Sequence, residues 1–350
     1  MSAAEVIRAF RDQASACARL GSPLTAALCT HLADTLPEQR GAVAERVIGW
    51  PGNPATQADS LPLRLAGALH ALVLSGTDKN LGHMYKTGKI DGTVLSNALM
   101  THADFILDWL GTAPQTNEVG RSAVIIAAAR FLAGKIDLPL HTLELGASAG
   151  LNLNFAHYGL HDDSPNRALR LCPDWHGIMP SASFRVAKSE GVDLRPIDPV
   201  KDRLRLMAYC WADQDQRLAR LTAALDLAAQ FPTRVTAGDA GAWLHERLAH
   251  PAHGATTLVF HTVAAQYFPP DTLASCEAAL QHAAAQTDHA TVLAHLGMEQ
   301  DGLGEGAGVT LRLWDGKLRE WQLGRADFHG RWVQWQPEPR KGLGLIAARG

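Results

Sequence analysis

The chain has 350 residues, which is long for a single domain and sufficient to bury a sizeable core. Its composition, 47% apolar and 19% charged, is that of an ordinary globular protein. The formal net charge is −3 and no long basic run occurs, which argues against a nucleic-acid partner, because such a partner usually needs a basic face.

The cysteines and the apolar segments indicate a cytoplasmic protein. The five cysteines are scattered single thiols, which is typical of a reducing compartment. The first residues carry charges where a signal peptide needs an apolar stretch. The most apolar helical run, residues 61–74, is too short to span a bilayer. We therefore expect no membrane contact.

The first third of the chain is rich in Ala, Leu and Arg, with apolar residues at helical spacing. This pattern predicts helices over residues 3–20, 23–36, 61–74 and 94–110. The loop-like segment 110–115 follows them. We therefore predict an all-helical N-terminal domain over residues 1–112 and a second domain over residues 113–350.

The second domain alternates between strand and helix patterns. Predicted strands cover residues 138–145, 191–194, 234–237, 257–262 and 291–296. Predicted helices cover residues 117–133, 202–210, 214–229, 240–248 and 271–286. Such alternation predicts an α/β fold with a doubly wound parallel sheet. Residues 309–314, 317–323 and 330–336 are predicted to form antiparallel C-terminal strands, with a turn at Asp315-Gly316.

The segment LELGASAGLNLNF, residues 143–155, allows two interpretations. Gly146 to Gly150 spells G-x-S-x-G, the nucleophile elbow of a serine hydrolase with Ser148 as nucleophile. Asp239 with His261, or Asp271 with His289, would complete the order Ser, Asp, His, an order that 16 histidines produce easily by chance. Mostly helical segments precede Ser148, and no HGGG-type oxyanion loop lies upstream, which disfavours this interpretation.

The second interpretation is a cofactor-binding turn. The predicted strand ends at Glu144-Leu145, Gly146 allows a tight turn, and Ser148 and Gly150 keep the path clear for a ligand. A dinucleotide site requires a G-x-G-x-x-G turn that accepts a phosphate, which Glu144 would repel. A cofactor with an ammonium and a sulfonium, S-adenosylmethionine, suits the acid better. The alternative is that Glu144 only caps or pairs locally.

The sequence E-L-G-A-S-A-G resembles the first motif of class I S-adenosylmethionine-dependent methyltransferases. More closely, the chain resembles a bacterial family catalogued as domain of unknown function 2332. The matching stretches are QTNEVGRSA (115–123), LELGASAGLNL (143–153), GVDLRPID (191–198), CWADQDQRLARLTAAL (210–225), TAGDA (236–240) and LVFHTVAAQYF (258–268). The resemblance implies a methyltransferase-like (Rossmann-like) fold and names no substrate.

The resemblance also implies roles for two acids. Asp193 would bind the ribose, although its distance from the glycine turn requires an insertion at about 160–188; the alternative is a turn acid before Pro196. Asp239 would bind the adenine amino group; the alternative is a helix N-cap. The family pattern places a helix after the fifth strand, whereas residues 297–308 are glycine-rich and are interpreted as a loop.

We place the reaction and the methyl acceptor at the same sheet edge. His261 ends a predicted strand and is the candidate general base; the alternative is a hydrogen-bonded structural histidine. Asn117, Glu118 and Arg121 form a polar start to an apolar helix and are predicted to face the cleft opposite His261, with the helical domain as lid. Their alternative role is helix capping or domain docking.

The expected function is transfer of a methyl group from S-adenosylmethionine to a small molecule. The alternatives are a serine hydrolase and a non-catalytic ligand-binding protein of the same fold. His250 and His253 lie in a predicted loop without a thiol or carboxylate set to complete a metal site, so we expect no metal.

Overall fold

The structure is a computed structural model that describes residues 2–115, 117–161 and 167–345. By its internal contacts the chain divides into two compact units. The first unit comprises Met1–Thr116 and Asp202–Thr222, and the second comprises Asn117–Lys201 and Ala223–Gly350. Residues 202–222 therefore belong to the helical unit, although they follow a strand of the sheet in sequence. Helix α10 (Asp215–Gln230) begins in one unit and ends in the other.

The first unit is built of helices around one apolar core. They are α1 (Ala3–Arg19), α2 (Pro23–Thr35), α3 (Ala42–Ile48), α4 (Leu61–Leu74), α5 (Lys79–Thr87), α6 (Gly92–Thr101), α7 (Ala103–Leu110) and α9 (Arg203–Ala208). Helix α4 is buried on nearly every side, as its continuous apolar sequence requires. No helix among the described residues has the combined length and apolarity needed to cross a bilayer.

One predicted helix is wrong in its extent. Residues 94–110 were expected to form a single helix, but the chain breaks at His102, which ends α6 and precedes α7. The ring of His102 lies 3.1 Å from Oδ2 of Asp78, the N-cap residue of α5. The apolar spacing continues through the break, and a tertiary contact of this kind leaves no trace in that spacing.

Polar contacts attach the late segment 202–222 to the helical unit. Oδ2 of Asp213 accepts a 2.8 Å hydrogen bond from the backbone amide of Leu24, and the Ser22 hydroxyl donates to the same carboxylate. Nδ1 of the buried His70 lies 3.1 Å from the carbonyl oxygen of Ala208. Asp213 thus satisfies an amide at the start of α2, where helical donors have no partner within the helix.

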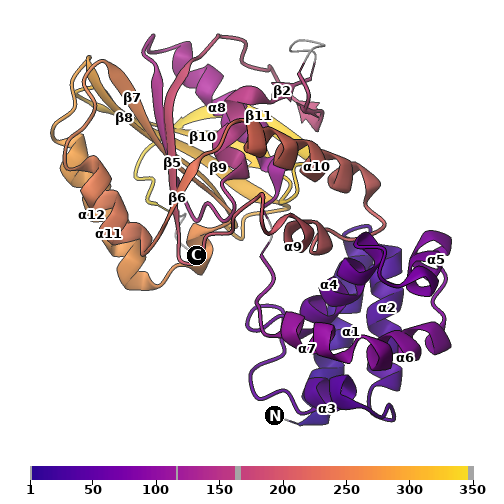
Figure 1. Cartoon of the computed structure of the whole chain (residues 1–350). Coiled ribbons are helices and arrows are strands. Elements are labelled where there is room, and N and C mark those ends of the chain that lie inside the picture. The colour runs from indigo at the N-terminus through magenta and orange to yellow at the C-terminus, as the bar shows by residue number, and fades with distance from the viewer. Residues whose placement is uncertain (1, 116, 162–166, 346–350) are drawn as a thin grey trace. The chain divides into compact units, whose positions relative to one another are not determined.

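The second unit contains a nine-stranded mixed sheet in the order β4-β11-β10-β9-β8-β7-β1-β5-β6 (Figure 1). The strands are β1 (Leu140–Leu145), β4 (Asp174–His176), β5 (Val186–Asp193), β6 (Arg234–Ala237), β7 (Ala255–Thr262), β8 (Thr291–Glu299), β9 (Ala307–Trp314), β10 (Leu318–Ala326) and β11 (Trp332–Arg340). β6, β5, β1, β7 and β8 run parallel, and β8 to β11 form an antiparallel series. The expected α/β class and the antiparallel C-terminal strands are confirmed.

Helices cover the sheet. α11 (Ala240–Leu248) and α12 (Pro270–Ala284) pack side by side and share an apolar core with Leu143, Leu145 and Val259 (Figure 1). Phe131 of α8 (Ser122–Ala133) packs edge-on against Trp321 and Trp335 of the antiparallel strands. Because side chains alternate along a strand, Glu144 points away from the core that Leu143 and Leu145 share with α11 and α12.

The segment between β1 and β5 carries extra strands. β2 (Gly159–Leu160) and β3 (Arg170–Leu171) pair with each other, and β4 joins the far edge of the sheet beside β11. The expectation of a loop over residues 297–308 is wrong at both ends. β8 continues to Glu299 and β9 begins at Ala307, so an antiparallel hairpin takes the place of the helix that the family pattern implied.

Candidate functional site

The carboxyl ends of β1, β5 and β7 meet at one edge of the sheet. β1 lies between β7 and β5, so the strand order reverses beside it. Ligands of open parallel sheets bind at such a reversal, outside the carboxyl ends of the strands. Two residues here have a left-handed backbone that only glycine adopts easily: Ser148 (φ 52°) after β1 and Val263 (φ 53°) after β7. Strained backbone clusters at functional sites, so this edge is the candidate site.

The glycine turn, residues 146–150, needs its glycines for two reasons. Gly146 (φ 72°) and Gly150 (φ 70°) are both left-handed. A Cβ on Gly146 would lie 2.6 Å from the Cβ of Ala264, and a Cβ on Gly150 would lie 2.8 Å from Oγ1 of Thr233. The space that the sequence interpretation reserved for a ligand beside Gly146 is therefore filled by the loop after β7.

Glu144 is a buried acid with an unsatisfied oxygen. Its side chain is 2% exposed, and Oε2 has no hydrogen-bond partner in the described structure. Burial raises the pKa of Glu144 well above the usual carboxyl range, and a hydrogen bond from Asn152 only partly opposes this. Asn152 is itself held by Ser122, whose hydroxyl donates a 2.7 Å hydrogen bond to its Oδ1. Buried polar atoms are normally paired, so Oε2 is a place where a ligand donor would bind.

Ser148, four residues after Glu144 in the chain, is a second buried residue with an unsatisfied side-chain oxygen. Its side chain is 7% exposed, and its Oγ is buried without a hydrogen-bond partner among the described residues. Its backbone amide donates a 2.9 Å hydrogen bond to Oδ2 of Asp193, and Oδ1 of Asp193 accepts a 2.8 Å hydrogen bond from the Arg195 amide. Asp193 therefore supports the glycine turn from the end of β5.

The backbone amides of the turn largely serve the protein itself. Four of them donate to protein acceptors: Gly146 and Ala147 to Val192 O, Ser148 to Asp193 Oδ2, and Gly150 to Ala147 O. The amide of Leu151, which follows the turn, donates to Asn117 Oδ1. A phosphate-binding turn works by directing such amides at the anion. Here a carboxylate already holds one of them, so the turn suits a ligand that brings donors or positive charge.

The predicted acceptor residues lie at this same edge. Oδ1 of Asn117 accepts the Leu151 amide at 2.8 Å. Arg121 donates to the carbonyl oxygens of Thr262 (3.0 Å) and Phe328 (2.8 Å). Glu118 is buried and accepts the amide of Gly120 at 3.0 Å. The segment thus joins the glycine turn to the end of β7 through contacts with backbone groups.

The family model described as "Uncharacterized protein conserved in bacteria (DUF2332)" matches residues 7–335, which covers nearly all of the chain. The chain belongs to this family. The resemblance to domain of unknown function 2332 that the sequence stretches indicated is therefore confirmed. No curated protein matches the chain significantly.

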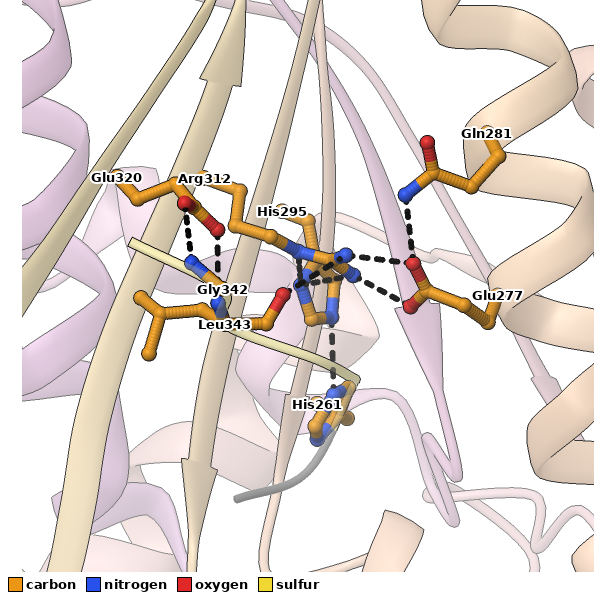
Figure 2. Close-up of polar contacts among 8 residues, drawn as sticks. All are labelled: His261, Glu277, Gln281, His295, Arg312, Glu320, Gly342 and Leu343. Atoms are coloured by element: carbon orange, nitrogen blue, oxygen red, sulfur yellow. Dashed lines mark hydrogen bonds and ion pairs between the residues drawn. The ribbon is translucent and has the colours of Figure 1, made fainter. Parts of the chain in front are cut away.

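His261 of this DUF2332 protein is fully buried. Its Nδ1 lies 2.7 Å from Oε1 of Glu299, and its Nε2 lies 3.0 Å from Nε2 of His295. His295 in turn contacts Arg312, which forms a bidentate pair with Glu277 of α12 at 2.7 and 2.9 Å (Figure 2). This geometry favours a structural His261 over a base that touches a substrate.

Asp239 caps a helix in the DUF2332 structure. It precedes α11, and its Oδ1 accepts the Ala242 amide at 3.0 Å. Its Oδ2 accepts a 2.6 Å hydrogen bond from Thr272 of α12. Hydrogen bonds from Thr272 and from the helix amides hold the pKa of Asp239 below its usual range. The N-cap interpretation accounts for the contact with Ala242, and the hydrogen bond from Thr272 links the cap to α12.

The DUF2332 structure has a surface cavity in each of its two units. One, of about 370 Å³, is lined by Asp174, His176, Arg325 and Trp332 among others, at the far end of the sheet. The other, of about 850 Å³, lies in the helical unit beside His83 and Ile90. In the described parts of the chain, no three His, Cys, Asp or Glu side chains gather in a way that could hold a metal ion.

The sequence interpretation missed Glu299. Its carboxylate accepts the amides of Ala264 and Ala265 at 3.0 Å each and that of Gln266 at 3.3 Å. Glu299 stands in a glycine-rich stretch that was interpreted as loop, and backbone donors have no signature in side-chain identity. Residues 297–299 are Gly-Met-Glu, and glycine and glutamate are depleted in strands, so residue types gave no signal that β8 extends to this position.

Proposed function

We propose that this DUF2332 protein binds S-adenosylmethionine at the carboxyl end of β1 and transfers its methyl group to a small molecule. The observation that carries the proposal is a pair of buried oxygen atoms without a hydrogen-bond partner among the described residues, Glu144 Oε2 near the end of β1 and Ser148 Oγ on the glycine turn that follows. A cationic amino group supplies donors to both oxygen atoms. The occupied turn amides and the neighbouring Asp193 disfavour a phosphate at this place.

The fold is consistent with a methyltransferase-like, Rossmann-like domain. The five parallel strands follow the order β6-β5-β1-β7-β8, in which the chain moves outward from β1 and then returns to its other side. In open parallel sheets, nucleotide-like ligands bind where the strand order reverses in this way, which supports the proposal. The antiparallel pairing of β8 with β9 departs from the helix that the resemblance implied after the fifth strand.

The bound cofactor would supply an electrophilic methyl group on a sulfonium. The chain would contribute placement and exclusion of water, which account for much of the rate of such displacements. Glu144 would hold the amino group, and Ser148 would add a hydroxyl beside it. Arg121 and Asn117 hold the ends of β7 and of the turn in register through Thr262 and Leu151. His261 stays in the interior and takes no proton from the acceptor.

The test is calorimetry with S-adenosylmethionine and with its demethylated product, S-adenosylhomocysteine. Wild type should bind both, whereas Glu144→Gln should weaken binding about tenfold or more, because a charged hydrogen bond contributes about 1.5–3 kcal/mol. Glu190→Gln is the control, because Glu190 is a similarly buried acid, on β5, that pairs with Lys188 at 2.8 Å. No heat with either ligand, or wild-type affinity in Glu144→Gln, would overturn the proposal. Binding without transfer to any acceptor would instead indicate a ligand-binding protein.

One observation favours a serine hydrolase as the second candidate. Ser148 sits on a strand-to-helix turn with a left-handed backbone, as the nucleophile of an elbow does. A nucleophile also needs a base in hydrogen-bond contact, and Oγ of Ser148 has no such contact among the described residues. A fluorophosphonate probe should therefore leave the protein unlabelled. Labelling that disappears in Ser148→Ala would establish the hydrolase.

A further inference from the structure

The loop after β7 is held in a strained conformation by one carboxylate. Val263 has φ 53°, which a β-branched residue rarely adopts. This backbone turns three consecutive amides, those of Ala264, Ala265 and Gln266, toward Glu299 at the end of β8. We call Glu299 and these three amides the Glu299 clasp. Successive amides directed at one anion form a recognised anion-binding arrangement, and here the anion is part of the chain.

The hydrogen bonds behind the clasp have only one possible direction. Arg312 can only donate, so Nδ1 of His295 is an acceptor and the proton of this neutral ring is on Nε2. His295 therefore donates to Nε2 of His261, and His261 donates from Nδ1 to Glu299. Each ring is therefore fixed in a single tautomer. An unbroken series of hydrogen bonds, which we call the line, runs from Arg312 through His295 and His261 to Glu299 (Figure 2 shows the part from Arg312 to His261).

The far end of this line is anchored on a different element. Both terminal nitrogens of Arg312 donate to the carboxylate of Glu277 on α12 (Figure 2). Burial raises the pKa of Glu277, but the hydrogen bonds from Arg312 outweigh it, so the acid stays ionised. The line therefore connects a covering helix, through β9, β8 and β7, to the loop at the candidate site.

The clasp also sets where the glycine turn lies. Ala264, the first residue of the clasp, fills the space beside Gly146, where an added Cβ would lie only 2.6 Å from its own. The ring of Phe268, a little further along the same loop, would lie 3.7 Å from that Cβ. A shift of the loop would therefore change the walls around Glu144 and Ser148.

We propose that Glu299, oriented by His261 and His295, is a positioning residue that fixes the loop after β7 against the glycine turn and so sets the affinity of the ligand site. The affinity part rests on the proposed function, whereas the positioning part concerns the protein alone. Neither histidine touches the ligand in this scheme. They act through Glu299.

The positioning part is tested by amide hydrogen exchange in Glu299→Gln. Whichever way the new amide turns, its NH2 group meets a hydrogen-bond donor, so the clasp opens. Exchange at Ala264, Ala265 and Gln266 should rise about tenfold or more, because a lost hydrogen bond to a charged group lowers local protection by that order. The amide of Gly146 should follow, because its neighbour Ala264 is released.

Glu320→Gln is the matched control. Glu320 is a buried acid of the same unit that also accepts hydrogen bonds from backbone amides, those of Gly342 (2.8 Å) and Leu343 (2.9 Å), which do not belong to the loop after β7 (Figure 2). Its loss should raise exchange only at these two amides. Unchanged exchange at the loop in Glu299→Gln, or an equal rise at every amide of the unit, would overturn the proposal. If Glu299→Gln does not fold, Glu299→Asp keeps the charge, shortens the reach, and gives the same comparison.

Two further readouts separate positioning from general support. Nitrogen-15 chemical shifts should show the proton of His261 on Nδ1 and that of His295 on Nε2. The opposite tautomers would overturn the series of hydrogen bonds from Arg312 to Glu299. S-adenosylhomocysteine should bind Glu320→Gln as it binds wild type and should bind Glu299→Gln about tenfold more weakly. Equal affinity in Glu299→Gln, despite faster exchange at the loop, would overturn the role at the ligand site. If wild type itself fails to bind, the proposed function fails, and exchange alone decides the positioning role.

Discussion

The backbone amide of Ser148 lies 2.9 Å from Oδ2 of Asp193, and this hydrogen bond joins the turn after β1 to the end of β5. The other oxygen of Asp193 accepts the Arg195 amide at 2.8 Å. An acid whose expected partner was a ribose thus has a protein donor on each oxygen. Asp193 holds Ser148, the left-handed residue at the centre of the glycine turn. The conformation of the turn therefore depends on a tertiary contact with β5 as well as on its own sequence.

Asp193→Ala should lower the free energy of unfolding by about 1–3 kcal/mol, because it leaves a partly buried amide without an acceptor. Denaturation with urea measures the change. Asp198→Ala is the control, because Asp198 also accepts two loop amides but in an exposed position. Its loss should cost only about 0.5 kcal/mol. Equal costs in the two variants would contradict the bridging role of Asp193.

Gly146→Ala should destabilise the protein more than Gly254→Ala. Both glycines are left-handed, with φ 72° and 75°, so both variants carry a backbone cost of about 1–2 kcal/mol. Only at Gly146 would the new Cβ meet another atom, the Cβ of Ala264 at 2.6 Å, whereas Gly254 has open space. Overpacking should add about 1–3 kcal/mol at Gly146. The two unfolding curves, compared directly, check this, and coincident curves would show that the loop moves aside freely.

Ser148→Ala should leave the unfolding free energy unchanged or raise it slightly. The hydroxyl that it removes is buried without a partner, and removing such a group relieves a desolvation cost. The left-handed backbone penalty is the same for both residues. Thermal unfolding of the two proteins without ligand gives the comparison. A loss above about 1 kcal/mol would mean that Oγ is satisfied in solution, for instance by an ordered water.

Glu144→Gln should remove part of the pH dependence of stability. Burial raises the pKa of Glu144 in the folded protein, with Asp193 adding to the shift and Arg121 opposing it. The folded state then keeps a proton that the unfolded state releases. Wild type should therefore lose stability relative to the variant as pH rises from the ordinary carboxyl range toward the raised folded pKa. Unfolding free energies of both proteins over that pH interval provide the check, and parallel profiles would refute the shift.

His295→Gln should act in the opposite direction. Burial, followed by the charge of Arg312 and the neighbouring His261, lowers the pKa of His295 well below its usual value. As pH falls, the His295 ring is therefore protonated in the unfolded state before it is protonated in the folded state. Wild type should therefore lose stability relative to the variant as pH falls below the ordinary histidine range. His245→Gln is the control for the substitution itself, because His245 is exposed.

Local patterns predicted many of the elements in both units. The bounds of α4, α11 and β6 agree with the structure, because apolar periodicity and turn residues define them within a few positions. The strand, glycine turn and helical start around residues 140–157 were likewise predicted, although the helical start is a 3-10 helix (Leu151–His157). The short helices α3 and α5 were missed, because each is too brief for a clear period.

The candidate site was only partly predictable. Glu144, Ser148 and Gly146 were identified because acid, glycines and strand end occur together in one short segment. The partners that define the site come from remote segments: Asp193 is 45 positions from Ser148, and Glu299 is 35 positions from Ala264. In both pairs one partner is a backbone amide, which every residue except proline possesses. No pattern of residue types reveals such a contact.

The pairing of β4 with β11 bears on how this protein is made. β4 is three residues long, Asp174–His176, and its described strand partner is Trp332–Gln334, close to the far end of the family match. A ribosome therefore releases β4 long before the strand against which it pairs. Contacts of such large sequence separation form slowly, and chains waiting to form them expose strand edges. The nine-stranded sheet is completed only after β11 has been synthesised, so β4 remains without its strand partner throughout the synthesis of the intervening residues.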